Sequence, residues 1–253
     1  MKFGVCCRLD RAQLVKDAGY DYVEEHFAGL NRMTDEEFDA VVLEYKKIGI
    51  PVSSTNCFFP FDWKLYEHEK EYYYDYAKRG FERASRLGIK TCVVGSGRPR
   101  SVPEGVDRAV TFEKFTAIMA YIADIAKEYG ITLVIEPLQP CETNFINTVE
   151  EGALVAKATG KDNVKVLVDF FQFYCANEPD DGLIKADGYL YHAHFARPNA
   201  DRKMPTEEDL PEIKKWISML KEIGYDNNIS VEGFIDFEND LVRTKKILDL
   251  FKK

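Results

Sequence analysis

The stretch YGITLVIE at residues 129–136 contains the unit that decides the fold. A glycine able to end a helix in the left-handed conformation is followed by a short apolar, β-branched run and then by a single acid. Similar Gly or Asn stops before short strand-like runs recur along the chain, in the segments AGYDY, IGIPV, LGIKT, TGKDNVK and IGYDNNI. This recurrence predicts an alternation of helices with short, buried, parallel strands.

Eight strands are predicted from these runs: Phe3–Cys7, Tyr22–His26, Val52–Phe58, Thr91–Gly95, Thr132–Glu136, Val164–Asp169, Leu190–Phe195 and Ile229–Phe234. Stretches of helical period separate and follow them. A first helix runs to about Ala18, and TDEE predicts a capping box that opens the second at Thr34. The others are predicted at Thr34–Lys47, Glu67–Leu87, Thr111–Tyr129, Val149–Thr159, Pro179–Lys185, Leu210–Ile223 and from Leu241 to the end.

The length of 253 residues is close to the ~250 residues of a (β/α)8 barrel. No break in composition divides the chain, so residues 1–253 are predicted to form one α/β domain, a TIM barrel. The competing architecture is an open doubly wound sheet. Such a sheet usually carries a glycine-rich phosphate-binding turn after its first strand, where this chain has Cys6-Cys7-Arg8-Leu9.

The charge balance argues against several classes of partner. The net charge of −9 disfavours a nucleic-acid partner, because such proteins need a basic surface to displace counterions from phosphates. No segment approaches the ~20 apolar residues of a membrane span, and no signal-peptide run opens the chain. Six scattered cysteines without a CxxC pair are typical of reduced thiols, so we expect a cytoplasmic protein. A homo-oligomer is compatible with the sequence, which points to no interface.

Polar residues end the last four predicted strands. LVIE ends in Glu136, VLVD in Asp169, YHAH in His194, and ISVE in Glu232. The carboxyl ends of barrel strands meet at one mouth, where three converging carboxylates would repel one another. One divalent cation with a neutral imidazole as its fourth ligand relieves that repulsion. A single buried acid is often a structural hydrogen-bonding group, but four metal-ligand types on consecutive strands favour a metal site.

His192 competes with His194 for the role of ligand, because strand alternation puts both on one face. His194 lies nearer the mouth and is the better ligand. His192 is then expected one layer deeper, as a core or supporting histidine.

Several motifs resemble the xylose-isomerase-like TIM-barrel superfamily, the sugar phosphate isomerase/epimerase group, over essentially the full chain. IEPLQPCETNFINT (135–148) is similar to a segment typical of its D-tagatose 3-epimerase branch. VLVDFF, HAHFARP and ISVEGF resemble the family's metal-binding strand ends, and GSGRPRSVPEG (95–105) resembles a family loop.

The resemblance implies a metal held by Glu136, Asp169, His194 and Glu232, with Mn²⁺ favoured and Mg²⁺, Co²⁺ or Zn²⁺ as substitutes. The mixed oxygen and nitrogen ligands also suit Mn²⁺. It further implies that Glu136 and Glu232 form the acid/base pair that removes and returns a proton next to a carbonyl, through a metal-stabilised enediolate. Glu142 corresponds to a family carboxylate that hydrogen-bonds sugar hydroxyls.

Two positions depart from the family pattern. Gln172 stands where the family usually has a histidine, and glutamine can donate a hydrogen bond to substrate but cannot carry a proton at neutral pH. Arg197 and Pro198 stand where an acid is common, and Arg197 or Arg202 could hold an anionic group or pair with surface acids.

His26 and Asn56, at the ends of the second and third strands, are expected to line the pocket. His26 is a hypothetical substitute for the missing proton carrier.

The predicted function is therefore a metal-dependent isomerase or epimerase of a small sugar or keto-sugar. Two alternatives stay open: a lyase or dehydratase acting on a keto-sugar or inositol ketone at the same metal, and a non-catalytic sugar-binding barrel. The superfamily also contains a three-zinc endonuclease, but that site needs more histidines than the four present here.

Overall fold

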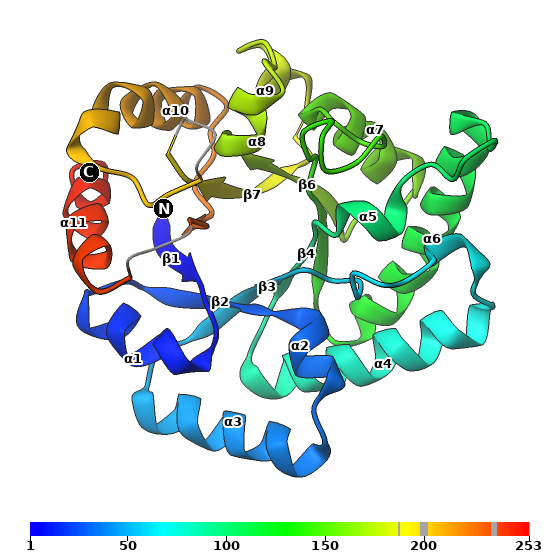
Figure 1. Cartoon of the computed structure of the whole chain (residues 1–253), viewed down its shortest axis with the longest axis horizontal. Coiled ribbons are helices and arrows are strands. Elements are labelled where there is room, and N and C mark those ends of the chain that lie inside the picture. The colour runs from blue at the N-terminus through cyan, green and yellow to red at the C-terminus, as the bar shows by residue number, and fades with distance from the viewer. Residues whose placement is uncertain (187, 198–201, 234–236, 253) are drawn as a thin grey trace.

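The computed structural model describes residues 1–186, 188–197, 202–233 and 237–252. Its centre is a closed barrel in which each of eight strands pairs in parallel with the next and β8 pairs with β1 (Figure 1). The strands are β1 (Lys2–Cys6), β2 (Tyr22–His26), β3 (Val52–Asn56), β4 (Thr91–Val94), β5 (Thr132–Ile135), β6 (Val164–Asp169), β7 (Leu190–Phe195) and β8 (Asn228–Val231). The predicted (β/α)8 barrel is confirmed.

Helices surround this ring of strands (Figure 1). The longer ones are α1 (Leu9–Asp17), α3 (Asp35–Ile48), α4 (Lys70–Leu87), α6 (Arg108–Glu128), α7 (Val149–Ala158), α10 (Leu210–Glu222) and α11 (Phe237–Asp249). Short ones are α2 (Phe27–Arg32), α5 (Gly97–Arg100), α8 (Phe170–Cys175), α9 (Gly182–Lys185) and the 3-10 turns η1 (Leu65–Glu67) and η2 (Glu207–Asp209).

The helix stops and the cap follow the sequence prediction. The six predicted glycine stops all have positive φ, which only glycine adopts without steric cost: Gly19, Gly49, Gly88, Gly130, Gly160 and Gly224. Thr34 accepts from the Glu37 N–H and Glu37 reciprocates, so the predicted capping box opens α3.

The differences concern element ends near the barrel mouth. The third strand stops at Asn56 rather than Phe58, because Cys57 has φ 51° and cannot continue an extended chain. The short helices α2, α5 and α8 follow β2, β4 and β6 and have no predicted counterpart, since one or two turns show no clear period. The predicted Pro179–Lys185 helix is reduced to α9. Phe234, the predicted end of the last strand, lies outside the described residues.

Two apolar layers hold the barrel together. Alternate strand residues such as Cys92, Leu133 and Val166 are fully buried in the main core cluster. Val93, Val134 and Leu167 point the other way, into the barrel, and form a separate cluster there. Full burial of a valine or leucine side chain stabilises the fold by about 1.5–3 kcal/mol.

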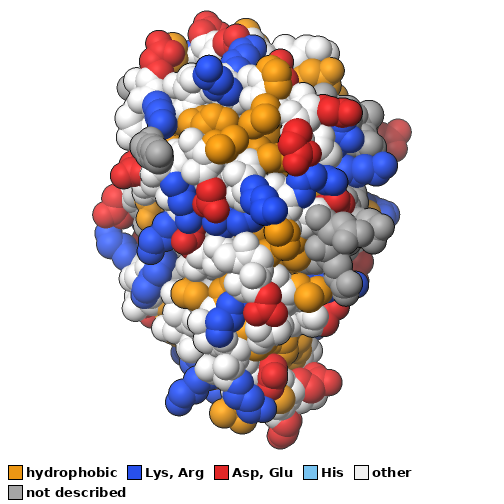
Figure 2. Space-filling view, turned by 90° about the vertical axis from the view of Figure 1, so that its left-hand side faces the viewer, with side chains coloured by type: hydrophobic (Ala, Val, Ile, Leu, Met, Phe, Trp, Pro, Cys, Tyr) orange, Lys and Arg blue, Asp and Glu red, His pale blue; other side chains and the backbone are white. Residues whose placement is uncertain are grey.

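The surface carries both signs of charge. Basic and acidic side chains are intermixed over the face shown in Figure 2, with apolar side chains between them. Within the described part of the chain, no helix has the length and apolar character needed to cross a membrane.

Candidate metal centre

Four side chains predicted as metal ligands meet at the barrel mouth. Glu136 follows β5, Asp169 ends β6, His194 lies near the end of β7, and Glu232 follows β8. Asp169 and His194 are partners in the β6–β7 register. One candidate ligand atom from each of the four residues lies within 4.8 Å of all the others. The parallel barrel brings them together because every strand ends at the same rim.

Gly95, directly after β4, makes room for Glu136. A Cβ atom at this position would lie 1.8 Å from the Glu136 Oε2 atom, which is far inside van der Waals contact. Any other residue at position 95 would therefore displace the carboxylate.

His194 is fully buried and fixed at both ring nitrogens. Its Nε2 lies 2.9 Å from Oε1 of Glu24, a buried acid on β2. Its Nδ1 lies 3.1 Å from Glu232 Oε2 and 3.6 Å from Glu136 Oε1. When Nε2 donates to Glu24, Nδ1 is the nitrogen that faces the carboxylates, and a histidine metal ligand usually donates its other N–H to such an acid.

The acids are balanced by cations within the chain. Arg202 Nη2 lies 2.6 Å from Asp169 Oδ2 and also contacts Glu232. The pKa of His194 is raised well above its ordinary value, because Glu24 and Glu232 outweigh the opposing effect of burial. A protein that puts three acids at one point thus needs positive charge there, which a divalent cation also supplies.

The two glutamates predicted as the acid/base pair differ in proton affinity. Burial raises the pKa of Glu136 to about 7. For Glu232 burial acts in the same direction, but the charges of Arg202 and His194 outweigh it and lower the pKa to about 2. Two neighbouring acids with separated pKa values can hold and accept a proton respectively.

The donor set fits a divalent cation. Among the described residues, no group donates a hydrogen bond to the buried Glu136 Oε1 atom, and its nearest cationic neighbour is His194 Nδ1 at 3.6 Å, so this oxygen has a lone pair free for a metal ion. Three carboxylates and one imidazole nitrogen match the preferences of Mn²⁺, Co²⁺ and Zn²⁺. Among the described residues, ligand atoms of Cys6, Glu24 and His194 also lie within 4.8 Å of one another. In that second group the Glu24 carboxylate already bonds His194 Nε2, so the four-residue group is the better metal site.

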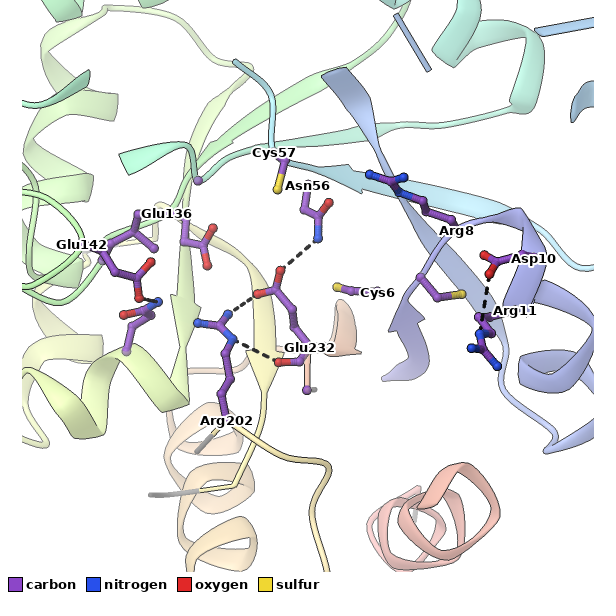
Figure 3. A pocket seen from close by; sticks show the side chains of 15 residues that line it. Cys6, Arg8, Asp10, Arg11, Asn56, Cys57, Glu136, Glu142, Arg202 and Glu232 are labelled. Carbon is purple, nitrogen blue, oxygen red and sulfur yellow. Dashed lines mark hydrogen bonds and ion pairs between the residues drawn. The ribbon is translucent and has the colours of Figure 1, made fainter. Parts of the chain in front are cut away.

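A cavity of about 660 Å³ opens above these residues, within the ~300–1,000 Å³ range of small-molecule sites (Figure 3). It is lined by Cys6, Cys7, Arg8, Asp10, Arg11, Asn56, Cys57, Gly95, Glu136, Leu138, Glu142, Gln172, Arg202, Glu232 and Gly233.

Three further predicted residues lie in this wall. Asn56 Nδ2 donates to Glu232 Oε1 at 2.9 Å. Gln172 is buried, and its Nε2 donates to Glu142 Oε1 at 2.8 Å while its Oε1 accepts from the Gln139 N–H. Gln172 therefore orients Glu142 at the edge of the cavity.

His26 and Arg197 are placed elsewhere and are not among the lining residues. His26 caps α2, where its Nδ1 accepts from the Gly29 N–H at 2.8 Å. The Arg197 guanidinium lies 3.3 Å from Glu208 and 3.2 Å from Asp209. The structure thus brings seven of the nine predicted site residues together. Pro198, noted beside Arg197, lies outside the described residues.

The buried residues that support the ligands were not among the predicted site residues. Glu24 was not singled out, although strict alternation along YVEEH puts it on the same face as Tyr22 and His26. Arg100 is fully buried and donates to the carbonyl oxygens of Val94 at 2.8 Å and Glu136 at 2.6 Å. Its position in GSGRPR gave no sign that it would fix the backbone of a ligand. His192, expected deeper in the barrel, is buried 2.8 Å from Glu24.

Comparison with known proteins identifies the family to which the chain belongs. The family model described as xylose isomerase-like TIM barrel matches residues 12–253. A D-psicose 3-epimerase of Agrobacterium fabrum is 28% identical over 227 residues, 87% of this chain and 77% of that protein. An inosose isomerase of Bacillus licheniformis is 24% identical over 255 residues, 92% of this chain and 88% of that protein.

A solved structure of similar fold is the crystal structure of the IOLI protein with a bound zinc atom. It superposes with a TM-score of 0.76 at 19% identity and covers 99% of this chain and 98% of its own. At this identity the likeness shows the fold.

Proposed function

We propose that this chain, which belongs to the xylose isomerase-like TIM barrel family, is a divalent-metal-dependent isomerase or epimerase of a sugar or keto-sugar. The observation that carries the proposal is the convergence of Glu136, Asp169, His194 and Glu232 at one point beside a small-molecule cavity. By its relatives the chain is an enzyme of the isomerase and epimerase class. Their names denote a ketose and an inositol ketone, so both act on polyhydroxylated ketones.

Glu136 and Glu232 are proposed to move the proton. Glu232, whose pKa is low, is the carboxylate that can accept a proton from the carbon next to a carbonyl. Glu136 is proposed to return the proton; in the metal-free protein burial raises its pKa to about 7. Return to the opposite face of the same carbon gives an epimer, and return to the neighbouring carbon gives an isomer.

The metal is proposed to be held by Glu136, Asp169, His194 and Glu232, with Mn²⁺ the favoured ion. When bound, a divalent cation acts as a Lewis acid that polarises carbonyl and hydroxyl oxygens. Support for a metal comes from the Glu136 Oε1 atom, which accepts no hydrogen bond from the described residues, and from the mixed oxygen and nitrogen donors.

Three residues are proposed to orient the substrate. Glu142 lies on the cavity wall with Gln172 bonded to its Oε1, so its second oxygen is available to sugar hydroxyls. Asn56 donates to Glu232 and fixes that carboxylate at the cavity edge. Arg202 lies against Asp169 and Glu232 and adds positive charge where an oxyanion would develop.

The first test is the Glu136→Gln substitution. The variant keeps an amide oxygen as a potential ligand but cannot return a proton, so we expect conversion of substrate into its epimer or isomer to fall at least ~100-fold. Wild type and variant are loaded with Mn²⁺ in D2O, metal content is measured, and product formation and deuterium uptake with ketoses and inositol ketones are followed by NMR.

The control is Glu104→Gln, which changes an exposed acid that is not among the cavity-lining residues. We expect it to keep wild-type conversion and exchange. Retained conversion into epimer or isomer in Glu136→Gln with bound metal would remove Glu136 from the proton path. Product analysis in the same tubes separates an epimer or isomer from the dehydrated product of a lyase. Sugar binding without any exchange would indicate a binding protein.

A further inference from the structure

The cavity is chemically divided into two ends (Figure 3). Glu136, Glu142 and Arg202 lie on one side together with the proposed ligand cluster. Arg8, Asp10 and Arg11, from the end of β1 and the first turn of α1, lie on the other. Cys6 and Cys57 lie between them and carry no charge as thiols. A substrate whose carbonyl end reaches the ligand cluster therefore presents its remote end to the first β–α loop.

Arg8 is the residue of this loop best placed to meet a ligand. Its side chain is exposed and extends from the start of α1 toward Cys57 (Figure 3). Within the described part of the chain, the Arg8 guanidinium makes no hydrogen bond or ion pair. A guanidinium offers five N–H donors in a planar fork that matches the oxygens of a carboxylate or phosphate.

The two acids near Arg8, Asp10 and Glu25, already have other partners. Arg11 Nε lies 3.6 Å from Asp10 Oδ2, so the charge of Asp10 is balanced by Arg11. Burial raises the pKa of the nearby acid Glu25, and the positive charge of Arg8 opposes that rise. Its carboxylate already accepts from the Leu9 and His26 N–H groups and from the Tyr45 hydroxyl. Arg8 is therefore not needed to satisfy the hydrogen bonding of Glu25.

We propose that Arg8 binds an anionic group at the end of the substrate remote from the reacting carbonyl, so that the substrate is a sugar phosphate or a sugar acid. This inference rests on the proposed function and deepens it by naming the substrate class. Phosphate and carboxylate share the chemistry that a guanidinium recognises, and the experiment below separates them.

The test compares a matched set of probes. Mn²⁺-loaded enzyme is given D-fructose, its 6-phosphate or D-fructuronate, which differ at the end remote from the carbonyl in being neutral, phosphorylated or carboxylated. Deuterium uptake gives kcat/KM for each. We expect one anionic probe to exceed D-fructose by about 10-fold or more. Arg8→Gln should reduce that advantage by about 10- to 100-fold, as expected for losing a hydrogen bond to a charged group, mainly through KM.

Two further variants make the result specific. Arg8→Lys keeps the charge but not the fork and should retain an intermediate preference. Arg32→Gln removes an exposed arginine that pairs with Asp62 and is absent from the cavity wall, so it should leave all three values unchanged. Equal kcat/KM for neutral and anionic probes, or an equal decrease for all three in Arg8→Gln, would overturn the inference.

Failure of the proposed function gives a different result. If no probe exchanges, binding of inorganic phosphate to the metal-loaded protein is measured by calorimetry in wild type, Arg8→Gln and Arg32→Gln. Weaker phosphate binding in Arg8→Gln alone would support an anion site at Arg8 even in a chain without the proposed chemistry. Equal phosphate binding in all three proteins would overturn the anion site.

Discussion

Glu24 is the buried carboxylate that sets the orientation of His194. Its Oε1 lies 2.9 Å from His194 Nε2, while Oε2 accepts from Ser54 at 2.7 Å and Ser230 at 2.6 Å. His192 also lies 2.8 Å from Oε2. These partners keep Glu24 charged, and the pKa of this acid is well below its ordinary value because His194 and His192 outweigh the effect of burial. The imidazole is thereby held with Nδ1 toward the carboxylates.

We expect Glu24→Gln to weaken divalent metal binding by about 10- to 100-fold, the usual cost of losing the acid behind a histidine ligand. Calorimetric titration of the metal-free protein with Mn²⁺ measures this. The matched control is Glu25→Gln, the neighbouring buried acid on the same strand, which bonds Tyr45 and backbone N–H groups instead. Unchanged Mn²⁺ affinity in a folded Glu24→Gln protein would contradict the orienting role.

At the scale of elements, Glu178 joins the segment after α8 to the start of α7. It accepts from the N–H of Val149, the first residue of α7, at 2.8 Å. Burial raises the pKa of Glu178 to about 7, and the nearby acids Glu151 and Glu150 add to the effect. The fold therefore favours the protonated form of this carboxyl. This contact lies away from the candidate ligands, so its titration is separable from the metal.

The sign of the pH dependence follows from that shift. Because the pKa of Glu178 in the folded state is above its value of ~4.3 in an unfolded chain, its contribution to stability is present below that value. It is lost progressively as pH rises from that value through about 7. We expect Glu178→Gln to have nearly the same Tm as wild type at about pH 4 and a higher Tm at about pH 8. Thermal unfolding at several pH values checks this, with Glu104→Gln as an exposed control. A Tm difference that does not change with pH would refute the assignment.

At the scale of the whole molecule, the proposed ligands tie together one half of the barrel. Glu136, Asp169, His194 and Glu232 come from the ends of β5 to β8 and lie up to 96 positions apart, as 232 − 136. Their ligand atoms meet within 4.8 Å only when the strands are in register. A cation bound by all four therefore binds the folded chain in preference to the unfolded one, and binding is linked to stability.

Mn²⁺ at 100 times its dissociation constant should stabilise the fold by about 2.7 kcal/mol. For a chain of this size that corresponds to a rise in Tm of roughly 5–10 °C. Removal of the ion by a chelator should reverse the rise, and His194→Ala should abolish it. Differential scanning calorimetry with and without Mn²⁺ measures both effects. An equal rise in wild type and His194→Ala would place the bound ion elsewhere.

Local patterns in the sequence were sufficient for the architecture. A helix stop and a short β-branched run depend on neighbouring residues alone, so Gly130 and the strand that follows it could be identified without knowledge of the rest of the chain. The acids at strand ends were also visible, because an isolated charge after an apolar run needs a special reason to be buried. Parallel closure then put Glu136 and Glu232 at one rim.

The tertiary structure decided which other side chains reach that rim. Glu24 bonds His194 across 170 positions, and Arg202 enters the cluster from the segment between β7 and β8. His26, by contrast, caps α2 instead of entering the cavity. The sequence alone determined a barrel with metal-ligand types at four strand ends, because those signals are periodic and local. The supporting contacts depend on loop paths and barrel closure, which arise from packing between residues far apart in the chain.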